Sequence, residues 1–162
     1  MSVNLSLLDA RIRALEDIEA IRHLRMTYHH YTNEGMYDRV GDLYTEDAYV
    51  DFNLLATARG RENIRALILK LNGSVTFIKQ FITNHMVTLN GDTASGVSYL
   101  DARYVQDGNA VIAAVRYSDK YRRTADGWKM SEMLVKIYFC VPISVGWAEE
   151  KLHYMKPVSE MA

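Results

Sequence analysis

The spacing of apolar residues predicts helices in the first half of the chain. A run at steps of three and four residues marks one face of an amphipathic helix, and it consists of Leu15, Ile18, Ile21, Leu24, Tyr28 and Thr32. Gly35 follows this run, and glycine is typical of the position just beyond a helix end. The pattern also predicts a short helix over about 36–43 and a third that opens at 60–63 and ends near Leu71.

The remaining apolar patterns predict strands. Segment 48–52 alternates between apolar and polar residues. Four longer runs are rich in β-branched and aromatic residues, and hairpin-turn sequences separate them; they cover 77–89, 94–105, 110–123 and 128–141. This order predicts an α+β fold, in which three N-terminal helices pack on a strongly curved, mainly antiparallel sheet to form a cone with an internal cavity.

Length and composition favour one domain over residues 1–162, with a core at about 10–147 and a C-terminal tail at 148–162. The 19 basic and 20 acidic residues are spread along the chain, so no basic face for nucleic acid is expected. The sequence shows no signal peptide and no apolar run of membrane-spanning length, which predicts a cytoplasmic protein without a membrane partner.

Motif content argues against cofactors. The single cysteine, Cys140, excludes an intramolecular disulfide and a cysteine-cluster metal site. The sequence has no histidine or carboxylate ligand cluster and no glycine-rich nucleotide motif, so neither a metal nor another cofactor is expected.

Several motifs then carry a family resemblance. They are Asp17-Ile18-Glu19-Ala20-Ile21, Leu43 to Ala48, Gly60 to Ile64, Asn90 to Gly96, and Tyr117 to Arg123 followed by Asp126 to Met130. Together they resemble SnoaL-like domains of the nuclear-transport-factor-two-like superfamily over about residues 10–147. The resemblance implies a cone fold shared with scytalone dehydratase, bile-acid 7α-dehydratase, a dehydrochlorinase and a diarylpropane formaldehyde lyase. It also implies cofactor independence and a homotrimer.

The resemblance also shows what is missing. Eliminating members carry an aspartate near the end of the first helix and a histidine on a strand, and these positions correspond to Asn33 and Gln80. An Asp–His dyad removes a proton because the carboxylate orients and stabilises the imidazole. The two amides can bond a substrate but cannot accept a proton at neutral pH. The usual dyad is therefore absent.

Three other residues are candidates for the chemistry, beside Asn33 and Gln80. Tyr28 lies where bile-acid dehydratase-like members place a catalytic tyrosine. The alternative interpretation is that it is a tyrosine of the core. Lys136 interrupts the apolar last strand; facing the cavity it would be a desolvated base, whereas facing outward it would serve a subunit interface. His29 borders the helix stripe and is a candidate pocket base.

Strand alternation predicts the pocket wall. The candidate substrate-binding residues are Tyr49, Phe52, Ile82, Asn84, Leu100, Ala102 and Tyr117. If Asn84 faces the pocket, the adjacent His85 faces away.

The predicted function is a cofactor-independent lyase acting on a small apolar hydroxylated substrate, aromatic or polycyclic, by loss of water or formaldehyde. Such a role fits aromatic compound catabolism. Two alternatives stay open: an isomerase or cyclase acting on a polyketide-like or steroid-like substrate, and a non-catalytic ligand-binding subunit.

Overall fold

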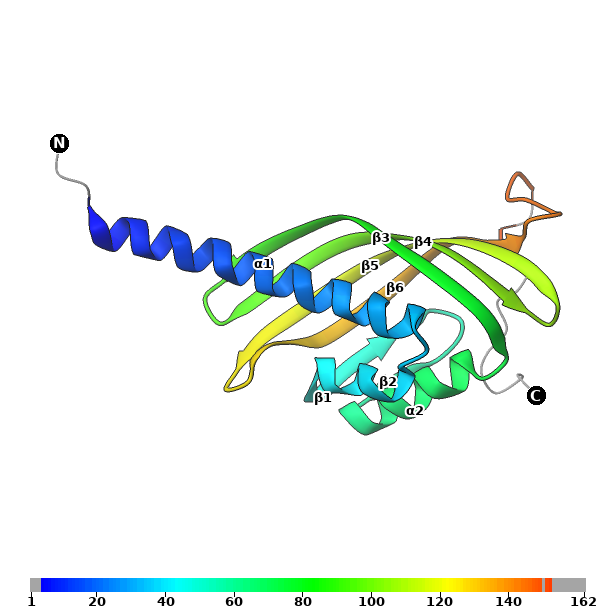
Figure 1. The fold of residues 1–162 in the computed structure, drawn as a ribbon, viewed down its shortest axis with the longest axis horizontal. Helices are drawn as coiled ribbons and strands as arrows, with labels where there is room; N and C mark the ends of the chain where they lie inside the picture. The colour runs from blue at the N-terminus through cyan, green and yellow to red at the C-terminus, as the bar shows by residue number, and fades with distance from the viewer. Residues whose placement is uncertain (1–3, 150, 153–162) are drawn as a thin grey trace.

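The computed structural model describes residues 4–149 and 151–152, so most of the predicted tail lies outside the described residues. Figure 1 shows the helices on one side of a curved sheet. The helices are α1 (Leu5–Asn33), the 3-10 helix η1 (Tyr37–Leu43) and α2 (Arg61–Asn72). The strands are β1 (Tyr44–Asp51), β2 (Thr57–Arg59), β3 (Val75–Asn90), β4 (Thr93–Gln106), β5 (Asn109–Thr124) and β6 (Gly127–Pro142).

The strands form one unclosed sheet in the order β2-β1-β6-β5-β4-β3. β3 to β6 make the predicted antiparallel meander. β1 pairs in parallel with β6, and the short β2, which the sequence pattern did not reveal, pairs antiparallel with β1. The predicted α+β cone is therefore confirmed, with a mixed, mostly antiparallel sheet.

Helix α1 is fixed to the sheet near its middle and at its end. Its Ile21, Leu24 and Tyr28 are buried against the concave face of the sheet. The Asp17 carboxylate accepts hydrogen bonds from Arg123 at 2.6 Å and from the Trp128 indole at 2.9 Å. The β5–β6 hairpin thus holds the helix in place, while the residues before Asp17 extend beyond the sheet (Figure 1).

A bulge in β3 changes which side chains reach the core. The register with β4 shifts by one residue between Thr83 and Met86, and Asn84 adopts a positive φ of 51°. An extra residue reverses the alternation that follows it. His85 therefore turns inward, and the predicted inward position of Asn84 is wrong.

Candidate functional site

A cavity of about 160 Å³ lies between the helices and the concave face of the sheet. Its wall is mostly apolar, with contributions from α1, α2 and β3 to β6. Six predicted site residues line it: Tyr28, Gln80, Phe52, Leu100, Ala102 and Tyr117. None of the described lining residues is Asp, Glu, Lys, Arg or His. A proton acceptor in the lining would therefore be a neutral group, and a carboxylate, amine or imidazole acceptor would come from a residue next to the lining.

Tyr28 and Tyr117 are two buried phenols in this wall, 4% and 4% exposed. Burial raises the pKa of Tyr28, and it raises that of Tyr117 to about 12. The nearby Arg25 guanidinium acts against both shifts. Both groups are therefore protonated and able to donate a hydrogen bond to an oxygen in the cavity.

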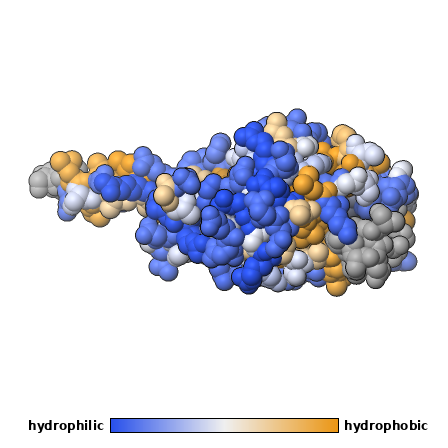
Figure 2. All heavy atoms as spheres, turned by 90° about the horizontal axis from the view of Figure 1, so that it is seen from below, coloured by the Kyte–Doolittle hydropathy of each residue, from blue (hydrophilic) through white to orange (hydrophobic). Residues whose placement is uncertain are grey.

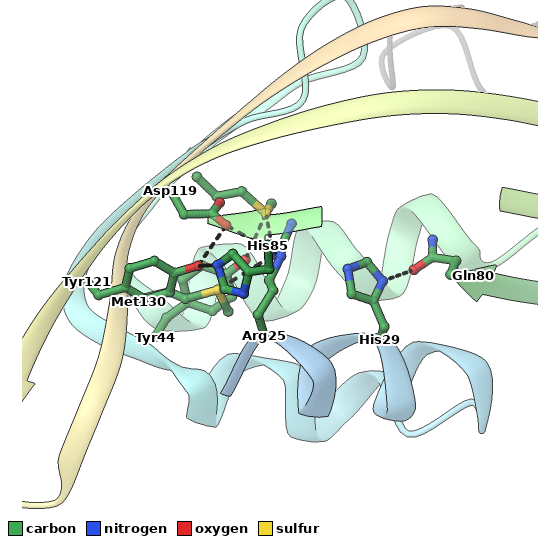
Figure 3. A network of polar contacts seen from close by, with 9 residues as sticks. Arg25, His29, Tyr44, Gln80, His85, Asp119, Tyr121 and Met130 are labelled. Carbon is green, nitrogen blue, oxygen red and sulfur yellow. Dashed lines mark hydrogen bonds and ion pairs between the residues drawn. The ribbon is translucent and has the colours of Figure 1, made fainter. Parts of the chain in front are cut away.

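His29 lies next to these phenols and is paired with Gln80. The His29 ring centroid is 5.0 Å from that of Tyr28 and 5.7 Å from that of Tyr117. His29 Nδ1 is 2.8 Å from Gln80 Oε1 (Figure 3). Because a carbonyl oxygen only accepts, Nδ1 carries the proton and Nε2 keeps its lone pair.

The environment of His29 keeps the imidazole neutral. Burial and then the positive charge of Arg25 lower its pKa to about 3. Nε2 is buried and has no hydrogen-bond partner among the described residues. It is therefore an acceptor without a partner among the described side chains, on a ring that packs against two cavity-lining phenols.

Deeper in the cone, Arg25 and Asp119 form a fully buried ion pair that the sequence reasoning missed. Nε of Arg25 lies 3.4 Å from Oδ2 of Asp119, and neither side chain is exposed. Tyr121 donates a hydrogen bond to the same Oδ2 at 2.9 Å, and His85 Nε2 lies 3.2 Å from the Tyr121 hydroxyl. Figure 3 shows this network beside the His29–Gln80 pair. Buried charge pairs are costly and concentrate at functional sites.

The pair could have been suspected from two features. Arg25 occupies a position three residues before Tyr28, on the buried side of the helix. Asp119 stands between two inward tyrosines, Tyr117 and Tyr121, so it shares their face of β5. Burial raises the pKa of Asp119, and Arg25 and the Tyr121 hydroxyl oppose that shift.

The structure contradicts the predicted placement of Asn33 in the pocket. Its amide accepts from the Gln80 backbone N–H at 2.6 Å and donates to the Gln80 carbonyl at 2.9 Å. Both ends of the side chain are used to join α1 to β3. Asn33 therefore positions Gln80 and does not face the cavity.

Lys136 is also misplaced in the prediction. Its neighbours Val135 and Ile137 line the cavity, so alternation directs Lys136 outward. Its side chain is exposed, and its amine lies 5.4 Å from the Tyr138 ring. A desolvated Lys136 base is excluded by this geometry.

Three predicted wall residues lie elsewhere. Tyr49 stands between the buried Ala48 and Val50 on β1, and Arg59 lies over its ring at 5.1 Å. Ile82 packs against the core but is not among the lining residues. Asn84 is exposed because of the bulge. The wall is accordingly less polar than expected.

The described part of the chain holds no group of three His, Cys, Asp or Glu side chains suited to a metal ion. Among the described helices, none is long and apolar enough to cross a membrane.

Comparisons with known proteins agree with this architecture. Residues 13–133 match the family model of the SnoaL-like domain. A candidate aromatic ring hydroxylase from Novosphingobium aromaticivorans is 31% identical, with 79% of this chain and 94% of that chain covered and a TM-score of 0.74. An NTF2-like protein from the same organism is 29% identical, covering 85% and 92%, with a TM-score of 0.70.

A hexachlorocyclohexane dehydrochlorinase, LinA type 2, is 18% identical over 87% of this chain and 93% of that chain, with a TM-score of 0.73, which shows the shared fold alone. Because the family model covers most of the sequence, the chain belongs to the SnoaL-like domain family.

Proposed function

We propose that this protein is a cofactor-independent lyase that acts on a small hydroxylated aromatic compound. The observation that carries the proposal is the His29–Gln80 pair at 2.8 Å beside two cavity-lining phenols. A neutral imidazole behind the cavity wall, next to two phenols of that wall, is the combination that supports acid–base chemistry on a bound molecule. A structural relative named as a candidate aromatic ring hydroxylase supports an aromatic substrate.

The size of the cavity favours a single ring. An apolar cavity of about 150 Å³ is large enough for benzene, and this one measures about 160 Å³. Ile68, Leu100 and Val115 supply apolar contacts, while Tyr28 and Tyr117 supply the donors that orient a substrate oxygen.

For loss of water, His29 Nε2 takes a proton from the carbon next to the one that carries the hydroxyl. The C–O bond breaks, and Tyr117 or Tyr28 gives its proton to the departing oxygen. For loss of formaldehyde, Nε2 takes the proton of a hydroxymethyl group and the C–C bond breaks. The phenol then protonates the carbon that keeps the electron pair. In both cases the imidazolium returns its proton to the phenolate.

Arg25 supports either reaction without touching the substrate. Its guanidinium carbon lies 3.8 Å from the centroid of the Tyr117 ring. A positive charge at this place stabilises a phenolate as it forms. The same charge disfavours a protonated His29 in the resting protein, so proton transfer to His29 and proton transfer from the phenol would occur together.

One observation favours a second function, a non-catalytic ligand-binding subunit. No described side chain of the lining is charged at neutral pH, and the positions that the family resemblance assigns to the Asp–His dyad hold Asn33 and Gln80. A wall of this kind holds an apolar ligand without reacting with it.

Turnover of a panel of hydroxylated aromatic compounds separates the two functions. Formaldehyde is detected chemically and dehydrated products by NMR. We expect His29→Asn and Tyr117→Phe to lower kcat by about 10²-fold or more, as is usual for loss of an acid–base group. Lys136→Met and Tyr99→Phe, which alter side chains on the outer face, serve as matched controls. Binding without any turnover by the wild type would favour the ligand-binding subunit.

A further inference from the structure

The protruding part of α1 carries an exposed apolar stripe, which we call the N-terminal stripe. It consists of Leu5, Leu8, Ile12 and Leu15, which are 74%, 44%, 46% and 67% exposed. Figure 2 shows apolar atoms gathered along this part of the helix. Exposed leucines in such a row indicate a partner surface.

The chain's own sheet does not cover this stripe. An α-helix turns by about 100° per residue, which places Ile12 on the opposite side from Ile21, and Leu8 nearly opposite Leu24. Ile21 and Leu24 are the residues that face the sheet. The N-terminal stripe therefore points away from the body of the protein, and Leu15, which the sequence pattern assigned to the face of Ile21 and Leu24, belongs to the exposed stripe.

The spacing of the stripe is that of a coiled coil. Leu5, Leu8, Ile12 and Leu15 follow alternate steps of three and four residues, which are the a and d positions of two heptads. Ile12 at an a position with Leu8 and Leu15 at d positions favours two parallel strands. The next a and d positions are Glu19 and Arg22, so the apolar seam ends where the helix reaches the body.

The flanking charges select the partner and its direction. In a parallel pair, a g residue meets the e residue five positions later on the second helix, so Arg11 would face Glu16 of the second copy. Neither residue forms an ion pair within the described part of its own chain. In an antiparallel pair e positions face each other, and those of this chain, Asp9 and Glu16, are both acidic.

We propose that residues 5–18 of α1 bind the same residues of a second copy as a parallel two-stranded coiled coil. Because each stripe faces away from its own sheet, the two bodies lie on the outer sides of the helix pair. The pairing is independent of the chemistry proposed for the cavity. It also differs from the trimer that the family resemblance implies.

Cysteine cross-linking tests the pairing and its direction. A parallel pair in register places Leu8 next to Leu8 of the second copy, so Leu8→Cys should form a disulfide-linked dimer rapidly under mild oxidation. Ala10→Cys, on the far side of the same exposed turn, is the matched control. The wild type, whose only cysteine is buried, gives the background. Cross-linking of Leu8→Cys no faster than Ala10→Cys would overturn the proposal.

Analytical ultracentrifugation of the full chain over a range of concentrations tests the energetics. We expect a species of twice the 18.6 kDa chain mass, and at least tenfold weaker association for Ile12→Glu, with an unchanged circular dichroism spectrum. Arg11→Glu and Glu16→Arg should each weaken association, and the double variant should restore it. A monomeric wild type, or an assembly that Ile12→Glu does not weaken, contradicts the coiled coil.

Discussion

The Arg25 guanidinium lies against the Tyr117 ring, with its central carbon 3.8 Å from the ring centroid. Tyr117 faces the cavity on its other side, and Arg25 is paired with Asp119. A charge buried in the core is therefore one aromatic ring away from the cavity. This arrangement couples the stability of the ion pair to the acidity of a pocket phenol.

Removing Arg25 should destabilise the fold strongly. Arg25→Met leaves Asp119 buried without its partner, and loss of one member of such a pair costs about 3–5 kcal/mol. The Arg25→Met/Asp119→Asn variant should recover much of this loss, because the introduced amide is neutral and its oxygen can still accept from Tyr121. Urea unfolding of both variants measures the difference. Equal instability of the two would show that the unpaired charge is not the cause.

The stability of the protein should fall as the solution becomes acidic. The folded-state pKa of His29 is about 3, below the ordinary value of 6.5. Between these values the unfolded chain binds a proton that the folded chain does not, so the free energy of unfolding decreases as pH falls. The slope for one such group is at most roughly 1.4 kcal/mol per pH unit.

Urea midpoints measured between about pH 7 and pH 5 for the wild type and His29→Asn test this slope. His85, with its pKa lowered to about 4, acts in the same direction and should leave a residual dependence in the variant. Asp119, whose pKa burial raises, acts in the opposite direction by losing stability as pH rises. An identical slope in both proteins would mean that His29 takes up its proton equally well in the folded state.

The fold could be predicted because many residues encode it redundantly. The strand periodicity and the turn sequences between the strands predicted the bounds of β3 to β6 to within a few residues. β2 was missed because three residues carry too little periodicity. α1 begins sixteen residues before its first buried residue, Ile21, since its first turns have no core of their own to face.

The positions of the candidate site residues could be predicted only in part, because single residues determine which side chains reach the cavity. One extra residue at Asn84 reversed the alternation of β3 and turned His85 inward. Asn33 was predicted to bond a substrate, but its partners are the backbone groups of Gln80, which sequence patterns do not reveal. Arg25 was missed because a charged residue within a helix is ordinarily a solvent-facing one.

Gly96 should be needed for the inward position of His85. A Cβ at residue 96 would lie 2.9 Å from His85 Nε2 and 3.1 Å from the Tyr121 ring. We expect Gly96→Ala to destabilise the protein by about 1–3 kcal/mol through overpacking. The same substitution in a His85→Ala background should cost less, since the nearest clash is removed. Thermal unfolding of the four proteins gives the coupling, and a coupling near zero would contradict the proposed contact.

Filling the cavity should weaken ligand binding without disrupting the fold. Ala113 lies in the cavity wall, and its neighbour Ala114 lies on the opposite face of β5. The isobutyl group of Ala113→Leu would occupy much of the roughly 160 Å³ space. We expect at least a tenfold weaker Kd for any hydroxylated aromatic compound that the wild type binds, measured by calorimetry; tenfold corresponds to about 1.4 kcal/mol.

Ala114→Leu adds the same group to the outer face and should leave binding unchanged. Because the added carbons of Ala113→Leu enter empty space, its unfolding midpoint should stay close to that of the wild type, unlike an overpacked core substitution. Undiminished binding by a folded Ala113→Leu variant would place the ligand somewhere other than this cavity. It would also remove the basis for assigning His29 and Tyr117 to the reaction.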